Sequence, residues 1–380
     1  MAQVLERPRV FSKSIKNYVT QKLLEADIQI NGPRPWDIHV LNEDFFSRLF
    51  YHRSLGLGES YMDGWIECAQ IDQLIYKLCR ANLGNSTSLN NIFIWLTSLI
   101  RNPQSKQRAL IVGRKHYDLS PRLFECMLDK RMIYSCAYWK NATNLEKAQE
   151  AKLDLICQKL YLKPGMKILD IGCGWGGLAK FAAENYAVKV VGITISQEQL
   201  ALAKEKCKGF PIELRFQDYR DIKETFDAIV SVGQMEHVGN RNYREYMRIV
   251  HRSLKTQGLF LLHTIGRNTT AYSTDRWTQK YIFPNGMLPS PTQLIHSSEN
   301  LFILEDWHNF GPDYEKTLLT WFHNFDMHWE ELSQFYDNRF YRMWKYYLLS
   351  CAGAFRAREI QLWQIIFSKG GIPGGYQSIR

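Results

Sequence analysis

The sequence predicts a doubly wound α/β sheet in residues 109–380, preceded by a small α+β domain in residues 1–85 and a linker in residues 86–108. Two observations support this fold class. From about residue 109 onward, short apolar runs alternate with segments of helical spacing, which indicates a parallel sheet with helical crossovers. A glycine-rich turn also follows the first strand-like run directly, as in open α/β sheets that bind ligands. The length of 380 residues favours two domains.

The N-terminal domain contains one clear helical pattern, Ser14–Ala26. Short strand-like pieces follow at Ile28–Ile30 and Ile38–Val40, and the stretch Ser54–Trp65 is rich in turn-forming residues. In the linker, the apolar segment Ile92–Ile100 is followed by several cations. Such a segment could lie on a membrane surface or pack against its own protein, and the sequence leaves both interpretations open.

The C-terminal domain begins with a predicted helix at Asn144–Leu162, whose capping box pairs Thr143 with Glu146. A second helix begins at Ser196, and the helices predicted between residues 313 and 356 form an aromatic-rich cap. Near the end of the chain, Ile360–Phe367 alternates like a late edge strand. The other predicted strands are Lys167–Ile171, Ala187–Thr194, Ile212–Phe216, Ala228–Val232 and Gly258–His263.

Composition and charge narrow the function classes. The formal net charge of +10 favours an acidic partner, such as nucleic acid, anionic lipid headgroups or an anionic cofactor, although a solvated basic surface is an equally good explanation. No apolar run approaches the roughly 20 residues of a membrane span, and no signal peptide is evident. The eight cysteines form no Cys-x-x-Cys pair and have no zinc-ligand spacing, which predicts reduced thiols, a cytoplasmic location and no metal site.

The glycine-rich turn runs from Leu169 to Gly177, with Gly172 and Gly174 at its start. By itself this string also fits a dinucleotide site, but such a site expects an acidic residue about 20 positions later to hold the ribose, and none is present. Asp170, two residues before the first glycine, instead suits the amino acid end of a sulfonium cofactor. The stretch resembles the first motif of class I methyltransferases. That resemblance implies S-adenosylmethionine as cofactor and a sheet with an antiparallel last strand; a nicotinamide enzyme and a turn without ligand are the alternatives.

Further cofactor contacts are expected at the same edge of the sheet. Thr194 and Gln199 are the polar side chains nearest the expected ribose position. Gln217, Asp218 and Tyr219 follow the third strand, where the adenine ring should lie. Tyr134 and Ser135, which precede the first helix of this domain, are predicted to close over the cofactor.

Other polar residues converge on this edge. Glu236 follows the fourth strand, His263 ends the fifth, and Cys136 lies in the segment that should close over the crevice. Each also has an ordinary structural explanation: a helix cap for Glu236, a core imidazole for His263 and a small buried hydrophobe for Cys136. Their expected convergence favours a reaction site.

Taken together, these motifs resemble the cyclopropane-fatty-acyl-phospholipid synthase family. The chain is also similar to the mycolic acid cyclopropane synthases, which lack the N-terminal domain, so the presence of residues 1–85 favours the phospholipid branch. The matching stretches are Gly56–Gly64, His116–Leu119, Tyr134–Trp139, Leu169–Gly177, Met235–Gly239, Tyr281–Gly286 and Cys351–Ala357.

The resemblance implies that a methylene group passes from S-adenosylmethionine to a cis double bond of a phospholipid acyl chain. The acyl chain would carry a positive charge until a bound bicarbonate ion takes up a proton. The family's bicarbonate holders correspond here to Cys136, Glu236, His263, the backbone at Ile265, and Tyr314. Cys351 has also been regarded as catalytic in the family; we interpret it as a pocket-wall residue, because no step needs a covalent thiol.

A lipid substrate implies an apolar tunnel, for which the stretch Trp321–Trp344 offers aromatic walls or, equally, ordinary core residues. By resemblance, the N-terminal domain would dock on anionic bilayers and form a homodimer, which places the enzyme in the cytoplasm at the inner face of the membrane. The alternatives are a methyltransferase acting on an amine or hydroxyl of a small molecule, and a nucleic-acid or membrane binding module. No RNA-binding motif is recognisable, and we expect no nucleic-acid partner.

Overall fold

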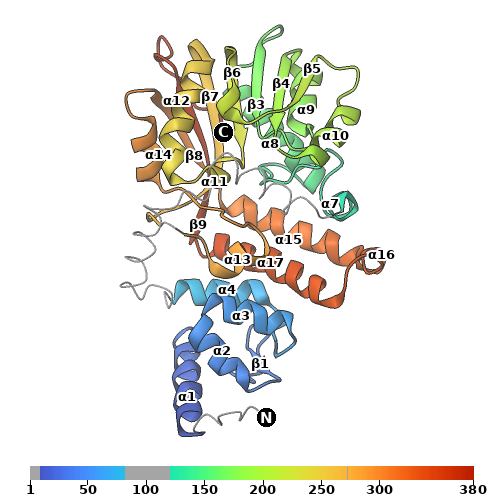
Figure 1. The fold of residues 1–380 in the computed structure, drawn as a ribbon, viewed down its shortest axis with the longest axis vertical. Coiled ribbons are helices and arrows are strands. Elements are labelled where there is room, and N and C mark those ends of the chain that lie inside the picture. The colour runs from blue at the N-terminus through green and yellow to red at the C-terminus, as the bar shows by residue number, and fades with distance from the viewer. Residues whose placement is uncertain (1–8, 82–119, 272) are drawn as a thin grey trace, which may run out of the picture.

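The computed structural model describes residues 9–81, 120–271 and 273–380. The predicted linker at 86–108, its apolar segment Ile92–Ile100 and the stretch His116–Leu119 therefore lie outside the described residues. The described chain forms a mixed sheet, a layer of helices beside one end of it and a smaller N-terminal unit (Figure 1). Within these ranges, no helix combines the length and apolar character that a membrane span requires.

The main sheet has seven strands in the order β5-β4-β3-β6-β7-β9-β8 among the described residues. Neighbours from β5 to β7 are parallel, whereas β9 runs antiparallel to both β7 and β8. This topology confirms the predicted doubly wound fold with an antiparallel last strand. The strands are β3 Lys167–Ile171, β4 Lys189–Thr194, β5 Ile212–Phe216, β6 Phe226–Val232, β7 Leu254–Arg267, β8 Ile303–Asn309 and β9 Ile360–Ser368.

Helices cover both faces of this sheet and bury separate apolar clusters against it. One face packs against α8 (Leu145–Lys159) and α9 (Gly177–Tyr186). The other packs against α12 (Tyr243–Ser253) and α14 (Pro291–Ser298). The shorter elements near the sheet are α10 Gln197–Lys206, α11 Met235–Val238 and the 3-10 turns Tyr219–Asp221 and Asn240–Asn242. Because these helices cover the two faces of the sheet, the carboxyl ends of its parallel strands are left free for a ligand.

The edge-strand prediction for Ile360–Phe367 is wrong, because β9 lies between β7 and β8 and almost all of it is buried. The edge strand on this side is β8, which the sequence analysis did not predict. Its sequence, Ile-Leu-Glu-Asp-Trp-His-Asn, contains too many polar side chains to stand out as an apolar run. An edge strand tolerates them because one side of it faces water.

Two local predictions also need correction. Asn144, rather than Thr143, caps α8, since its side chain accepts a hydrogen bond from the backbone N–H of Lys147. The turn-rich stretch Ser54–Trp65 is mostly helix α3, Ser54–Met62. Its glycines allow close packing, since a Cβ at Gly58 would lie 2.4 Å from the indole of Trp277.

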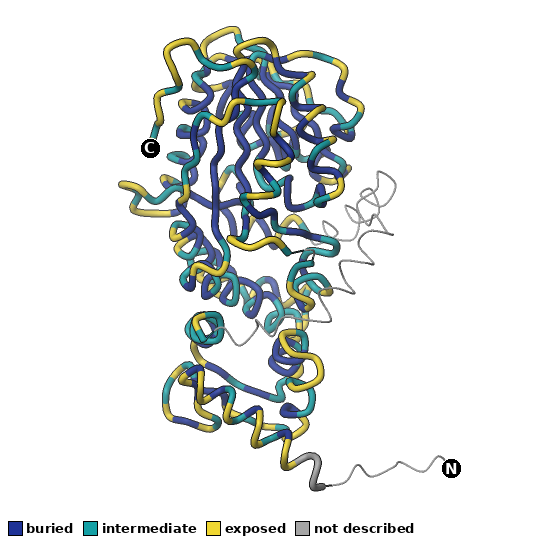
Figure 2. The backbone as a smooth tube through the Cα atoms, turned by 90° about the vertical axis from the view of Figure 1, so that its left-hand side faces the viewer, coloured by how far each residue is buried: buried dark blue, intermediate teal, exposed yellow. Residues whose placement is uncertain are grey.

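The predicted aromatic-rich cap between residues 313 and 356 is a pair of long helices, α15 (Pro312–Met327) and α17 (Asn338–Arg356), joined by the short α16 (Trp329–Leu332). The shorter α7 (Pro121–Met127) packs beside α15, and α13 (Arg276–Tyr281) packs on α3, with its Trp277 ring 4.7 Å from the Tyr346 ring of α17. Their buried side chains form one cluster with residues of the N-terminal unit. In Figure 2, buried residues, drawn in dark blue, are found in the sheet and also in the helices below it.

The N-terminal unit consists of α1 (Arg9–Glu25), α2 (Asp44–His52), α3, α4 (Ile71–Arg80) and a two-stranded sheet of β1 (His39–Val40) with β2 (Ile66–Glu67). The predicted strand at Ile28–Ile30 is reduced to one bridge between Ile30 and Ile38. The helices α3 and α4 pack directly on α17. The cap and the N-terminal unit therefore share a core.

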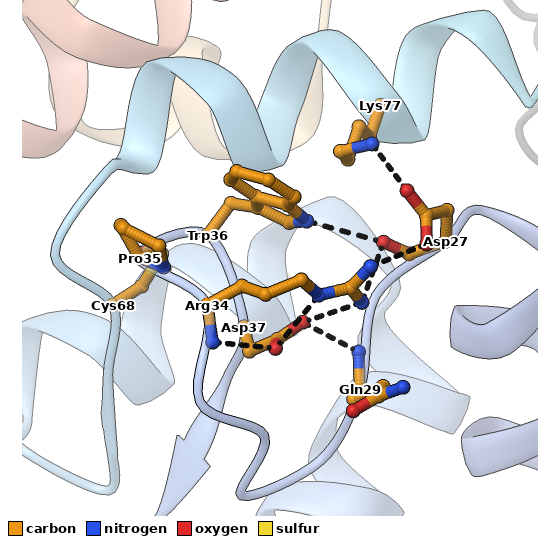
Figure 3. A network of polar contacts seen from close by, with 8 residues as sticks. All are labelled: Asp27, Gln29, Arg34, Pro35, Trp36, Asp37, Cys68 and Lys77. Carbon is orange, nitrogen blue, oxygen red and sulfur yellow. Dashed lines mark hydrogen bonds and ion pairs between the residues drawn. The ribbon is translucent and has the colours of Figure 1, made fainter.

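A buried carboxylate organises the loop that joins α1 to β1 (Figure 3). Asp37 is fully buried, and it accepts hydrogen bonds from the Arg34 guanidinium and from the backbone N–H of Gln29 at 2.8 Å. Although burial works in the opposite direction, these bonds lower the pKa of Asp37 to about 2. Arg34 also pairs with Asp27, which Lys77 of α4 contacts at 2.5 Å, so the loop is tied to the helix that packs on the cap.

Gly353, on α17, marks the closest approach between the cap and the N-terminal unit. A Cβ at this position would lie 2.3 Å from the Asp72 carbonyl oxygen and 3.0 Å from the Tyr76 backbone nitrogen. Helix propensity alone would make Gly353→Ala stabilising by about 1 kcal/mol. We expect the opposite sign, a loss of roughly 1–3 kcal/mol in the free energy of unfolding, because α4 must move away. Urea denaturation would measure it; a gain in stability would contradict this packing.

Candidate active site

A cavity of about 200 Å³ opens at the carboxyl ends of β3, β4, β5 and β6. Parallel strands bring their carboxyl ends to one edge of the sheet, so the loops that follow them meet there. The residues predicted to bind the cofactor all line this cavity: Tyr134, Ser135, Asp170, Gly172, Gly174, Thr194, Gln199, Gln217, Asp218 and Tyr219.

The glycine-rich turn approaches the loop after β6. Gly172 has a φ of 83°, a left-handed conformation that favours glycine, and a Cβ there would lie 2.7 Å from the Gln234 side-chain oxygen. Gln234 also lines the cavity and lies two residues before Glu236. The loop that carries Glu236 is therefore in contact with the glycine-rich turn, as the predicted site requires.

Asp170 lies at the floor of the cavity. Its carboxyl is buried, and its Oδ2 has no hydrogen-bond partner among the described residues. Burial raises the pKa of Asp170 to about 7, against the opposing influence of Lys152. A buried carboxyl of this kind is well suited to a cationic ligand, because the ligand's positive charge would restore its ionised form.

Lys152, on α8, also lines the cavity and was not predicted as a site residue. Its ammonium donates to the Ser135 hydroxyl at 2.8 Å, and burial lowers its pKa to about 8. One turn earlier, the Gln149 side chain donates to the carbonyl oxygens of Ser135 and Ile133 at 2.9 and 3.3 Å. These two buried polar side chains fasten the Tyr134–Trp139 segment to α8.

The predicted ribose and adenine residues have partners within the protein. The Thr194 hydroxyl donates to the Gln199 side-chain oxygen at 3.2 Å, and both residues are buried. Asp218 accepts from the Arg220 guanidinium at 2.9 Å, so its charge is partly balanced. The wall formed by these residues is polar without being strongly charged, which suits a nucleoside.

Glu236 is buried at the start of α11, just outside this cavity. Its Oε1 accepts a hydrogen bond from the backbone N–H of Ile265 at 2.7 Å, while Oε2 has no partner within the described ranges. Burial raises the pKa of Glu236 to about 7. The nearby Thr264 hydroxyl donates to the Ile265 carbonyl, and its proximity to the Glu236 carboxyl slightly opposes the rise in pKa of that group. The Ile265 N–H and carbonyl each have one partner in this structure, and a role of this backbone in holding an anion stays a prediction.

His263 lies on β7 next to the cavity wall: its carbonyl accepts from the backbone N–H of Gly233, a lining residue, at 2.9 Å. The ring is almost fully buried, and burial, together with the nearby cations Lys152 and Lys159, lowers its pKa well below the usual value. Its Nε2 has no partner in the part of the chain that the structure describes. His263 is thus a neutral imidazole with one nitrogen unused.

The remaining predicted catalytic groups are neutral. Burial raises the pKa of the Cys136 thiol well above its usual value and that of Cys351 to about 12, so neither is a thiolate near neutral pH. A neutral Cys351 thiol is a poor nucleophile, and this residue does not line the cavity, so its interpretation as a pocket-wall residue stays a prediction. Burial also raises the pKa of the Tyr314 hydroxyl, and the nearby Cys136 and Glu236 act in the same direction. Tyr314 is therefore available as a neutral donor.

Aromatic rings extend from the cavity into the cap. Tyr134 lines the cavity, and its hydroxyl group forms a hydrogen bond of 2.9 Å with the hydroxyl group of Tyr347. The centroid of its ring lies 5.2 Å from that of Trp321. We call Phe124, Tyr134, Trp321, Trp344 and Tyr347 the aromatic cluster. The predicted tunnel stretch does not act as one wall, because its Met327 and Phe335 are exposed on the surface.

Sequence reasoning missed Lys152, Gln149 and also Gln364, whose side-chain nitrogen lies 3.3 Å from the His263 ring nitrogen Nδ1. A signal existed for the first two, since Gln149 and Lys152 occupy the apolar positions of a helical pattern that runs through Leu145, Ala148 and Leu153. A polar side chain on the buried face of a helix needs a partner, and here the partner is the site. No comparable signal marked Gln364, because its role depends on which strands flank β9.

Comparison with known proteins identifies the family. The mycolic acid cyclopropane synthetase family matches residues 104–365. A cyclopropane-fatty-acyl-phospholipid synthase of Escherichia coli strain K12 is 55% identical over 350 residues, 92% of this chain and 92% of that protein. The structure of the cyclopropane synthase MmaA2 from Mycobacterium tuberculosis is 32% identical, with a TM-score of 0.64 over 68% of this chain and 98% of that one.

Mycolic acid cyclopropane synthase CmaA1, solved in complex with SAH and CTAB, is likewise 32% identical, with a TM-score of 0.65 over 68% of this chain and 98% of that one. The family match spans more than half of the chain, and the similarity to the Escherichia coli protein extends over nearly all of it. The chain therefore belongs to the mycolic acid cyclopropane synthetase family.

Proposed function

We propose that this chain transfers a methylene group from S-adenosylmethionine to a cis double bond of an unsaturated phospholipid acyl chain, closing a cyclopropane ring. As a member of its family, the chain is an S-adenosylmethionine-dependent methyltransferase that acts on lipid chains. The observation that carries the choice of a phospholipid is the extent of similarity. Identity to the Escherichia coli phospholipid enzyme is 55% over 92% of the chain, whereas similarity to the mycolic acid structures covers 68%.

The cavity residues fit the cofactor. When bound, S-adenosylmethionine supplies a methyl group on a positively charged sulfur. Asp170 offers its unpartnered Oδ2 to the ammonium of the amino acid end, and ionises as that charge approaches. Thr194 and Gln199 hold the ribose hydroxyls, and Asp218 and Tyr219 border the adenine. The glycines at 172 and 174 let the backbone approach the ligand without side-chain interference.

The acyl double bond must be held in line with the methyl group, because an alkene is a weak nucleophile. Bond formation leaves a positive charge on the acyl chain. The aromatic cluster can stabilise that charge through its ring faces without attacking it, at about 0.5–2 kcal/mol for each favourable contact. Its burial also excludes water, which would otherwise trap the cation.

Ring closure requires the loss of one proton from the new methyl group. Two buried polar atoms, Glu236 Oε2 and His263 Nε2, have no protein partner within the described residues, so they suit a small anion that both donates and accepts hydrogen bonds. Glu236, His263 and the Tyr314 hydroxyl would hold bicarbonate, which supplies a weak base there. Because the pKa of Glu236 is raised to about 7, this carboxyl can share a proton with a bound anion, and the Ile265 N–H fixes its orientation.

We propose that the N-terminal unit docks on a membrane and forms a homodimer. Several large apolar side chains of this unit are exposed: Tyr18, Leu24, Leu41, Phe50 and Tyr51. The net charge of +10 would add attraction to anionic lipid headgroups. Such a surface fits an enzyme that takes its substrate from a bilayer.

One assay tests the proposed function. The purified protein is incubated with S-adenosylmethionine and vesicles of either unsaturated or saturated phospholipid, and the lipids are analysed by mass spectrometry. We expect a gain of one methylene group on the unsaturated acyl chains alone. A product on a headgroup amine would instead favour a methyltransferase for amines or hydroxyls, and no product on either lipid would contradict the proposal.

A further inference from the structure

Three polar side chains form a row across the strands nearest the reaction site. Gln364, at the centre of β9, is the direct neighbour of His263 on β7 and of His308 on β8. Neighbours of this kind project from the same face of a sheet. Gln364 is fully buried, and the next residue on its side of β9, Ile366, packs in the cluster beneath α8 and α9. A buried amide at this position needs a reason, because an apolar side chain would pack there without leaving polar atoms to satisfy.

The reason lies in its contact with His263. The Gln364 side-chain nitrogen Nε2 lies 3.3 Å from the His263 Nδ1. An amide NH₂ group can donate a hydrogen bond but cannot accept one, so Nδ1 must supply the lone pair. His263 is neutral, because burial and nearby cations disfavour its charged form. A neutral imidazole carries one N–H only, and here that hydrogen must be on Nε2.

We infer that Gln364 is a positioning residue that holds His263 in the Nε2–H tautomer, so that the ring presents a hydrogen-bond donor to an anion placed between it and Glu236. The inference rests on the proposed function for the identity of that anion. The placement of the hydrogen rests only on the contact between the two side chains.

The reverse orientation of the amide is less favourable. It would let the Gln364 oxygen accept from Nδ1–H, but it would leave the NH₂ group unpaired in the core. In the structure, the Gln364 atom without a partner among the described residues is the oxygen Oε1. A buried N–H without an acceptor is rarer in proteins than a carbonyl that lacks a donor. The reverse orientation would also leave Nε2 as an acceptor, which could pair only with a protonated oxygen of the anion.

An amide suits this position better than a carboxylate. A glutamate at 364 could only accept a hydrogen bond while ionised, so Nδ1 would have to carry a proton. The ring would then either present a lone pair at Nε2 or become a buried imidazolium. Gln364→Glu therefore inverts the contact, whereas Gln364→Leu removes it.

Gln361 provides a matched control. It lies on the same strand, is equally buried and also uses its amide, accepting from Asn309 Nδ2 at 3.1 Å and donating to the Arg358 carbonyl at 2.7 Å. Because it is three residues from Gln364, it projects from the opposite face of β9 and does not pair with His263. Gln361→Leu therefore tests the loss of a buried amide by itself.

The test reads the ring nitrogens of His263 by NMR in the full-length protein labelled with ¹⁵N-histidine, with the signals assigned by their absence in His263→Gln. In the wild type we expect a protonated Nε2 and a bare Nδ1. In Gln364→Leu both signals should move toward the average of the two tautomers, and in Gln364→Glu Nδ1 should become protonated. Gln361→Leu should leave both signals unchanged. A protonated Nδ1 in the wild type, or wild-type signals in Gln364→Leu, would overturn the inference.

Kinetics provide the second measurement. We expect Gln364→Leu to lower kcat for ring formation about tenfold and to leave KM for S-adenosylmethionine unchanged. A misplaced hydrogen-bond donor reduces the stabilisation of the transition state, whereas it does not touch the cofactor. A rise in KM with unchanged kcat would contradict the positioning role. The NMR result does not depend on turnover. The expected tautomer in a protein that forms no cyclopropane product would therefore support the inference while counting against the proposed function.

Discussion

Replacing Glu236 with glutamine is expected to slow cyclopropane formation by roughly a hundredfold to ten-thousandfold, the usual contribution of a positioned proton-transfer group. The amide keeps the shape of the side chain, and its oxygen can still accept the hydrogen bond from Ile265. It cannot share a proton with an anion at the Oε2 position. Glu236 does not line the cofactor cavity, so the affinity for S-adenosylmethionine should change less than about twofold.

Single-turnover lipid analysis and equilibrium cofactor binding would measure the two effects separately. Removal of bicarbonate from the wild-type assay should reproduce the loss of rate without the loss of binding. Glu245→Gln, an exposed substitution on α12, is the matched control and should change neither. Equal losses of rate and affinity in Glu236→Gln would show that this carboxyl supports the cofactor site instead of the reaction.

Replacing Asp170 with asparagine is expected to weaken S-adenosylmethionine binding by about 10–150-fold, the contribution of a hydrogen bond between charged groups. The same substitution should stabilise the ligand-free protein. Burial raises the pKa of Asp170 from 3.8 to about 7 in the folded state, so folding is most favourable below pH 3.8, where the carboxyl is protonated in both states. That stability is lost as pH rises toward 7.

Asparagine has no such proton to lose. We therefore expect Asp170→Asn to exceed the wild type by roughly 4 kcal/mol in the free energy of unfolding at pH 8, and by less than about 1 kcal/mol near pH 4. Urea denaturation at the two pH values would measure this difference, with the exposed Asp221→Asn as control. An equal stability difference at both pH values would mean that Asp170 is already ionised at pH 4. That result would contradict the raised pKa expected from its burial.

The residues around the cofactor cavity were predictable for a simple reason. A strand of five or six apolar residues followed by a glycine-rich or polar turn is a local signal, and β3 was predicted with its observed bounds. In a parallel sheet, all such turns meet at one edge, whatever the order of the strands. The eight predicted residues at the ends of β3, β4 and β5 or just after them therefore line one cavity, whereas Tyr134 and Ser135 join them because α8 holds their segment there.

Elements whose character depends on their neighbours were not predictable in this way. The edge strand β8 is polar because one side of it is free, and β9 is buried along nearly all its length because it is inserted between β7 and β8. The glycines of α3 resemble a turn in the sequence, yet they mark a helix against which Trp277 packs. In each case the decisive contact is with a segment far away along the chain.

By itself, the sequence determined the strand-helix alternation, the glycine-rich turn and the residues at the carboxyl ends of the strands, because these depend on local apolar patterns and backbone freedom. Only the tertiary structure decided how those residues are tuned. Burial raised the pKa of Asp170 and Glu236 to about 7. The packing of distant segments brought Lys152 to Ser135 and Gln364 to His263. Desolvation and hydrogen-bond partners are properties of the packed chain, since both depend on groups brought together from distant positions.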